Sequence, residues 1–130
     1  MATIRHIAIF ADNPKELAKY YVEVFGMTIT SEHEGDAWLT DGYINFALLP
    51  RGREKMPKGI NHFGFTLDAE EKPKIYEKLK KLGLEPYDPR AADPSIVRPF
   101  VEDAALDPEG NRFDLSLGIR SMDEEKAKHD

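Results

Sequence analysis

Two segments of the chain, residues 4–10 and residues 60–67, alternate between large apolar residues and small or polar ones. This period of two predicts strands with one buried face. Each segment is followed by apolar residues at helical spacing and then by a glycine, Gly26 in the first case and Gly83 in the second. The pattern therefore predicts a strand–helix unit that occurs twice.

The first helix has clear ends in the sequence. Asn13 is a favourable N-cap, Pro14 suits the first helical position, and Glu16 stands where it could close a capping box. Gly26 is the expected left-handed stop. The apolar stripe that we expect to face the core consists of Leu17, Tyr20, Tyr21 and Val24.

Three short strands complete the first module, which we place at residues 4–50. Asp41-Gly42 is a two-residue hairpin signal that joins the second of these strands to the third. The three strands are predicted at residues 27–31, 37–40 and 43–49. A polar linker rich in Pro and Gly, residues 50–59, comes next.

The second module, residues 60–118, repeats this plan, and residues 119–130 form a charged tail that is expected to fray. A helix is predicted over residues 70–82, with Ile75, Leu79 and Leu82 facing inward. The remaining predicted elements are a strand beginning over residues 84–87, a proline-rich loop over 88–99, and a last hairpin of 100–105 and 112–117.

Composition limits the possible functions of a chain that we expect to be one domain, residues 1–130. The chain has no cysteine, which excludes disulfides, thiolate nucleophiles and zinc–thiolate sites. The net charge is −6, and acidic and basic residues are interleaved, which argues against nucleic-acid binding. No apolar run is long enough to cross a membrane and no signal peptide is recognisable, so we expect a cytoplasmic protein.

Four predicted strands carry small or polar residues on the face opposite their large apolar residues. If these faces curve toward one another, they line a cavity with His6, Asn45, His62 and Asp114 at its centre. Their neighbours on the same faces are Ala8, Tyr43, Ala47, Gly64, Thr66, Arg112 and Ser116.

In these features the chain resembles the vicinal oxygen chelate superfamily, over about residues 4–118. The most specific shared features are a histidine strand followed by a helix ending in Phe25-Gly26-Met27, and the stretch Asp107-Pro108-Glu109-Gly110-Asn111 before the last strand. The resemblance implies an α+β fold in which two βαβββ modules form an open, barrel-like mixed sheet. It further implies a divalent metal ion that the substrate chelates through two adjacent oxygens. It also implies a homodimer, in which the modules pair either within one chain or across the dimer.

The resemblance also implies a ligand set. The family's metal ligands fall on His6, His62 and Asp114, where Glu is usual in place of Asp114. A fourth ligand falls on Asn45, and because an amide cannot shuttle a proton, glyoxalase I activity is disfavoured. Two histidines and one carboxylate resemble the extradiol dioxygenase branch, and they would accept Fe, Mn, Zn, Ni or Co.

Other roles remain open for these residues. His6 and His62 could be structural histidines, although their equivalent positions in the two modules favour metal binding. Asn45 could be a weak fourth ligand, a hydrogen-bond donor to substrate, or a pocket wall. Trp38 and Tyr43 could belong to the core or stack on a ligand, and Arg98 and Phe100 could gate the cavity or serve in packing. His33 is interpreted as a solvated turn residue.

Two functions follow from these alternatives. The first is a metal-dependent dioxygenase, lyase or isomerase acting on a small molecule with adjacent oxygens. The second is a metal-free binding protein, similar to bleomycin-resistance proteins, that holds an aromatic compound through Trp38, Tyr43 and Phe100. Retention of both histidines favours the enzyme, whereas the missing fourth ligand and the short carboxylate favour the binding protein.

Overall fold

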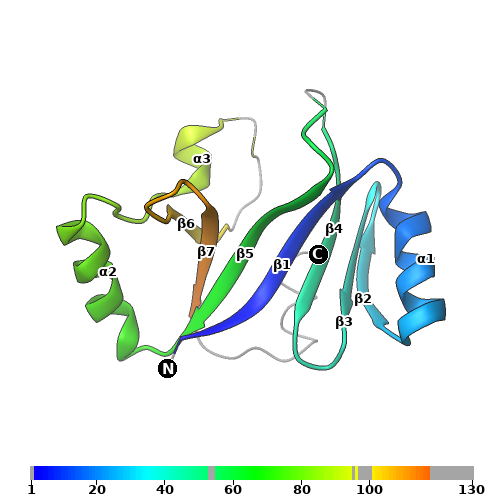
Figure 1. Ribbon diagram of the computed structural model, residues 1–130, viewed down its shortest axis with the longest axis horizontal. Helices are drawn as coiled ribbons and strands as arrows, with labels where there is room; N and C mark the ends of the chain where they lie inside the picture. Colours follow the sequence, from blue (N-terminus) through cyan, green and yellow to red (C-terminus); the bar gives the residue numbers. More distant parts are fainter. Residues whose placement is uncertain (1, 53–54, 95, 97–100, 118–130) are drawn as a thin grey trace. The chain divides into compact units, whose positions relative to one another are not determined.

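The computed structural model describes residues 2–52, 55–94, 96 and 101–117. Within these ranges the chain forms seven strands and three helices (Figure 1). Hydrogen bonding between neighbours gives the strand order β2-β3-β4-β1-β5-β7-β6, so the mixed sheet is open, with β2 and β6 at its edges. The elements are β1 Thr3–Ala11, α1 Pro14–Phe25, β2 Thr28–His33, β3 Asp36–Thr40, β4 Asn45–Pro50, β5 Gly59–Leu67, α2 Glu71–Lys81, α3 Pro89–Ala92, β6 Asp103–Leu106 and β7 Arg112–Leu117.

The chain divides into two compact units. We call residues 5–63 the N-terminal unit, and residues 2–4 and 64–117 the C-terminal unit. β1 and β5 each contribute residues to both units. The α+β class of the fold is as expected from the sequence, and in the part of the chain described here no helix has the length and apolarity needed to cross a membrane.

The N-terminal unit has the predicted order strand–helix–strand–strand–strand. β2, β3 and β4 form an antiparallel meander, and β1 pairs with β4 in parallel. The hairpin between β3 and β4 is longer than the two residues predicted, because β4 begins only at Asn45. The Asp41 carboxylate holds this wider turn by accepting hydrogen bonds from the backbone N–H groups of Tyr43 and Ile44, at 2.9 and 2.8 Å.

α1 begins and ends where the sequence predicts. The Asn13 Oδ1 atom accepts a hydrogen bond from the backbone N–H of Glu16 at 3.4 Å, and Gly26 ends the helix in the left-handed conformation, with φ 71°. The side chain of Glu16 forms an ion pair with Lys19 at 2.9 Å. The helix contacts β2, β3 and β4 (Figure 1).

The predicted apolar stripe of α1 is only partly correct. Leu17 and Tyr21 pack against the core as expected, together with the fully buried Ala18. Tyr20 and Val24, in contrast, are 50% and 57% exposed. The small side chain of Ala18 lies at the contact with the sheet, and at 100° per residue positions 20 and 24 turn well away from that line.

The core of the N-terminal unit lies between α1 and one face of the sheet. Leu39 and Leu48 are fully buried there, together with Ala37. On the opposite face of the same strands, Trp38 packs on Ala8 and Ala47 to form a second, smaller cluster. The first module therefore has close packing on both faces.

In the C-terminal unit α2 packs more loosely than predicted. Ile75 and Leu79 are half-buried, but Leu82, which was expected to face inward, is 69% exposed. Leu82 is the C-cap residue that follows α2, and Gly83 turns the chain away with a φ of 74°. The stripe therefore stops one turn earlier than its sequence spacing indicates.

The strand predicted over residues 84–87 is wrong. Tyr87 forms one isolated bridge with Ala104, through two backbone hydrogen bonds of 2.8 Å. Pro86 has no N–H to extend this pairing, and the following residues enter α3, whose first residue is Pro89. Within the predicted proline-rich loop, the described residues thus include a short helix, capped by the Asp88 carboxylate on the backbone N–H of Arg90 at 2.8 Å.

The final hairpin forms, although β6 begins at Asp103 rather than at residue 100. Its turn is organised by Asp107, whose carboxylate accepts hydrogen bonds from the backbone N–H groups of Glu109 and Asn111, each at 2.9 Å. These bonds, with the side-chain bond from Asn111 as the largest cause, lower the pKa of Asp107. The tail predicted for residues 119–130 lies outside the described residues, as do Arg98 and Phe100.

Candidate metal centre

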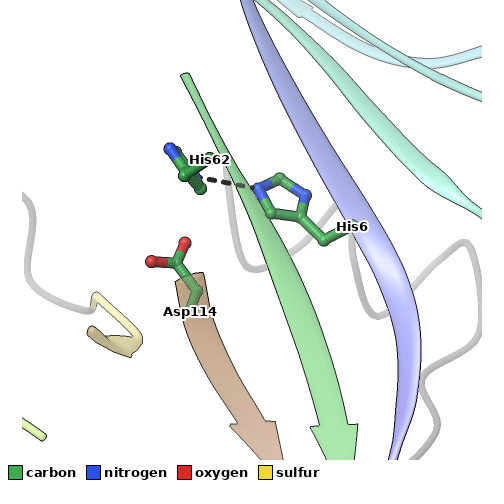
Figure 2. Close-up of side chains that lie close together, drawn as sticks. All are labelled: His6, His62 and Asp114. Carbon is green, nitrogen blue, oxygen red and sulfur yellow. Dashed lines mark hydrogen bonds between the residues drawn. The ribbon is translucent and has the colours of Figure 1, made fainter. Parts of the chain in front are cut away.

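His6 and His62 lie side by side on the neighbouring strands β1 and β5 (Figure 2). Their Nε2 atoms are 3.2 Å apart, and their ring centroids are 5.2 Å apart. His62 is buried, with 8% of its surface exposed, and His6 is half-buried. The structure thus brings together the two histidines that occupy equivalent places in the two modules.

The Nδ1 atom of each ring contacts an asparagine side chain. The Nδ1–H group of His6 donates to Asn45 Oδ1, and that of His62 donates to Asn61 Oδ1, both at 2.6 Å. An amide oxygen only accepts hydrogen bonds, so the hydrogen of each neutral imidazole is on Nδ1. Each Nε2 atom then carries a lone pair, which is the donor that a metal requires.

The Nε2 atoms lie at hydrogen-bond distance, 3.2 Å, and such a bond needs a proton on one of them (Figure 2). Without that proton the two facing lone pairs repel each other unless a cation lies between them. Two nitrogen ligands about 2.1 Å from one ion are about 3.0 Å apart at an angle of 90° and about 3.4 Å apart at the tetrahedral angle. The observed separation lies between these values. The two imidazoles therefore fit adjacent coordination positions of one metal ion.

Asp114 lies on β7, in the C-terminal unit. Its carboxylate is 13% exposed and pairs with the Arg112 guanidinium at 3.3 Å. The alternate residue Phe113 points to the apolar side of the strand and packs edge-on against Phe65, with ring centroids 5.5 Å apart. His6, His62 and Asp114 together offer two imidazoles and one carboxylate, a group that could hold a metal ion (Figure 2).

Trp38 and Ala47, two of the expected pocket residues, belong to the packed interior of the N-terminal unit. Ala47 is fully buried and Trp38 is 4% exposed. The Trp38 ring also stacks on His6, with centroids 6.1 Å apart and an angle of 17° between the planes. Trp38 therefore acts as a core residue that restricts the orientation of the His6 ring.

Tyr43 lies outside β4, in the turn before it, and is 50% exposed. The Arg5 guanidinium lies 4.1 Å from its ring centroid and donates to its backbone carbonyl at 2.9 Å. Gly64 is buried and Ser116 is half-buried in the C-terminal unit. His33 is the last residue of β2 rather than a turn residue, and its Nδ1 atom lies 3.1 Å from Asp36 Oδ1.

Asn61 contributes to the site but was not identified from the sequence. The period of two places it on the face of β5 opposite to His62, which would exclude a contact at the end of the imidazole ring. The contact forms because Nδ1 is the ring nitrogen nearer to the backbone. A side-chain amide directly before a candidate ligand histidine is the signal that would have found it.

The family model of the Glyoxalase/Bleomycin resistance protein/Dioxygenase superfamily matches residues 3–115. Among similar solved structures is the 2,3-dioxygenase LapB from Pseudomonas sp. KL28, with a TM-score of 0.68 and 18% identity, covering 92% of this chain and 41% of that one. The Mn(II)-bound glyoxalase from Novosphingobium aromaticivorans has a TM-score of 0.66 and 17% identity, covering 91% and 38%.

A hypothetical protein of similar length, BH1468 from Bacillus halodurans C-125, has a TM-score of 0.62 and 16% identity, covering 92% of this chain and 96% of that one. No curated protein matches the chain. At these identities the solved structures establish the fold alone, whereas the family model covers nearly all of the chain. The chain belongs to the Glyoxalase/Bleomycin resistance protein/Dioxygenase superfamily, as its histidine strands and final hairpin predicted.

Proposed function

We propose that this protein is a divalent metal-dependent enzyme that acts on a small molecule with two adjacent oxygens. One observation carries the proposal: two imidazoles, each with its Nδ1–H group bound to an amide oxygen, present their Nε2 atoms to each other at 3.2 Å. Metal-binding histidines commonly donate their second ring N–H to an oxygen acceptor in this way. The superfamily includes a dioxygenase and an Mn(II)-bound glyoxalase among the similar structures, which supports metal chemistry here.

His6, His62 and Asp114 would hold the ion. A bound divalent ion supplies Lewis-acid polarisation and a template for the substrate oxygens. Two neutral imidazoles and one carboxylate suit Fe, Mn, Zn, Ni or Co, and with Fe the set corresponds to the facial triad of non-haem oxygenases.

The residues around the proposed ligands limit the type of reaction that the site can catalyse. The buried Trp38 ring stacks on His6. Arg112 pairs with Asp114 and orients its carboxylate. Asn45 is bound to His6 and has no ionisable group, so it cannot act as the proton shuttle of a glyoxalase I reaction. We therefore favour a dioxygenase, lyase or isomerase of another kind.

We further propose that the protein is a cytoplasmic homodimer whose single domain, residues 1–130, consists of two modules, residues 4–50 and 60–118, joined by a linker at 50–59. The chain spans 41% and 38% of the length of the dioxygenase and the glyoxalase that it resembles. In the proposed homodimer, a second copy of the chain would bring the matched length to about twice these shares.

A metal-free binding protein of the bleomycin-resistance type is the second candidate. The pairing of Asp114 with Arg112 favours it, because a carboxylate that already has a cationic partner is less available to a metal. Aspartate is also one methylene shorter than the glutamate usual at this position. In this case the exposed aromatic ring of Tyr43 would contribute to binding an aromatic compound.

Metal content measured by elemental mass spectrometry decides between these functions. The protein is purified without chelator beside two variants, His62→Ala and the matched control His33→Ala, whose histidine ends β2 and contacts Asp36. We expect about one equivalent of metal in the wild type and in His33→Ala, and none in His62→Ala. No metal as purified, and no uptake on anaerobic titration with Fe(II), Mn(II) or Ni(II), would contradict the enzyme and favour the binding protein.

A further inference from the structure

We propose that Asn45 and Asn61 are positioning residues that select the Nδ1–H tautomer of His6 and His62, and so direct both Nε2 lone pairs to one ion. This inference rests on the proposed metal site. It assigns Asn45 a role different from the fourth ligand or pocket wall that the sequence left open. It also assigns a role to Asn61, which the sequence left without one.

Tautomer selection matters because the two rings have four combinations of neutral tautomers. Only one combination places both hydrogens on Nδ1 and leaves both Nε2 atoms as electron-pair donors. In any other combination at least one Nε2–H points toward the neighbouring ring, and that tautomer must be given up before an ion can bind. The hydrogen bonds of 2.6 Å from both Nδ1 atoms meet this requirement in advance.

The two asparagines reach their histidines through different parts of the fold. Asn45 is the residue of β4 directly opposite His6 in the parallel pairing with β1, so the register of these two strands fixes the contact. Asn61 precedes His62 on β5, so the contact depends only on local backbone geometry. All four residues lie in the N-terminal unit, which therefore builds the imidazole pair by itself.

An amide has an advantage over a carboxylate at these positions. Both groups accept from Nδ1–H, but a carboxylate adds a negative charge next to the imidazole. With two amides the proposed ligand set of two imidazoles and Asp114 keeps a charge of −1, which leaves a bound divalent ion with a net positive charge. A positive centre is better suited to attract and polarise anionic or enolate-like oxygens of a substrate.

The first test observes the tautomers directly in the metal-free protein. Long-range ¹H–¹⁵N NMR of the histidine rings, at a pH where they are neutral, distinguishes a protonated Nδ1 from a protonated Nε2. We expect Nδ1–H for both His6 and His62 in the wild type. Asn45→Leu, which has a similar volume but no acceptor, should shift His6 alone toward Nε2–H, and Asn61→Leu should shift His62 alone. Asn45→Asp, which keeps the acceptor, should retain Nδ1–H on His6.

The second test measures the dissociation constant of Co(II) or Zn(II) by competition with a chromophoric chelator. Loss of a hydrogen-bond partner of a metal-binding histidine typically weakens the metal 10- to 100-fold, and we expect about this loss in each leucine variant. Asn45→Asp should bind at least as tightly as the wild type. Melting of the metal-free variants by circular dichroism verifies that each is folded.

The results separate this inference from the proposed function. Unchanged tautomers in the leucine variants, or unchanged metal affinity, would overturn the positioning role while leaving the metal site intact. Absence of metal binding in the wild type would instead contradict the proposed function and, with it, the purpose assigned to the two asparagines.

Discussion

The helices α1 and α2 follow equivalent strands in the two modules, yet they are buried to different extents. α1 places the fully buried Ala18 against a core that contains Leu39 and Leu48. α2 contains no fully buried residue, and its inward side chains Ile75 and Leu79 are only half-buried. α1 thus contributes a small, fully buried residue to its core, whereas the inward positions of α2 carry longer, half-buried side chains.

The N-terminal ends of the two helices also differ, and here α2 is the more elaborate. Asn13, a neutral amide, caps α1 with one hydrogen bond. Before α2, Asp68 accepts from the backbone N–H of Glu71 at 2.9 Å, and the Glu71 carboxylate accepts from the backbone N–H of Asp68 at 3.3 Å. This reciprocal pair is a capping box. The duplicated plan thus combines a well-packed helix with a neutral cap in one module, and a loosely packed helix with an ionised cap in the other.

The largest expected effect is on the free energy of unfolding and tests the difference in packing between the modules. Leu39→Ala should lower the free energy of unfolding by about 2–5 kcal/mol, because it removes a fully buried side chain and leaves a cavity. Leu79→Ala, on the inward side of α2, should cost about 1 kcal/mol, since this half-buried side chain already contacts water in part. Urea unfolding followed by circular dichroism measures both. Equal losses would show that the second module is packed as tightly around Leu79 as the first is around Leu39.

The second prediction tests how the two units share the metal. The N-terminal unit supplies both imidazoles, and the C-terminal unit would supply only Asp114. Metal present at 100 times its dissociation constant stabilises a protein by about 2.7 kcal/mol. A 100-fold loss of affinity in Asp114→Asn would reduce this gain to about 0.4 kcal/mol. Ser116→Ala, two residues along the same face of β7, should retain the full gain in thermal melts with and without metal.

Mixing two inactive variants extends this prediction to the homodimer. If the modules pair across the dimer, a mixture of His6→Ala and Asp114→Asn chains contains mixed dimers with one complete ligand set, because the two altered residues lie in different modules, and metal binding partly returns. If each chain holds its own ion, the mixture binds no more metal than the separate variants. If Asp114→Asn gained as much stability from metal as the wild type in the thermal melts, Asp114 would not be a metal ligand.

Local signals in the sequence predicted most of the elements of the fold. The two alternating strands, the ends of α1, the meander of β2 to β4 and the final hairpin are all confirmed. Each of these depends on neighbouring residues, such as Asn13 and Gly26 at the ends of one helix. The wrong predictions, namely inward Tyr20, Val24 and Leu82 and a strand at 84–87, concern the direction in which a helix packs and the availability of a pairing partner. The packed face of a helix depends on residues distant in the sequence, whereas the strand at 84–87 is limited locally by Pro86 and by the start of α3 at Pro89.

The candidate site shows the same limit. Periodicity selected His6 and His62 because their strands repeat one pattern, and the structure places their Nε2 atoms in contact distance. The role of Asn45 could not be obtained in this way, because it depends on the register between β1 and β4. Trp38 and Ala47 share the strand faces of the candidate ligands, but alternation alone does not distinguish a cavity wall from a packed cluster, and they pack together with Ala8.

The smallest predicted effect concerns the two caps. Hydrogen bonding from the Glu71 backbone is the largest cause that lowers the pKa of Asp68 below its ordinary value. A carboxyl whose pKa is lower in the folded state stabilises the fold above its ordinary pKa, and this contribution is lost as the pH falls through the folded-state pKa. The N-terminal turn of α2 should therefore open in acid before that of α1, whose Asn13 cap does not titrate.

Amide hydrogen exchange of both helices, measured at decreasing pH, should show earlier loss of protection at the start of α2. Asp68→Asn, which keeps an acceptor but removes the ionisable group, should abolish this difference, whereas Asn13→Ala should weaken α1 equally at every pH. If protection of the two helices falls together in the wild type, the capping box has no measurable influence on acid stability, and the lower packing of α2 remains the difference tested by Leu39→Ala and Leu79→Ala.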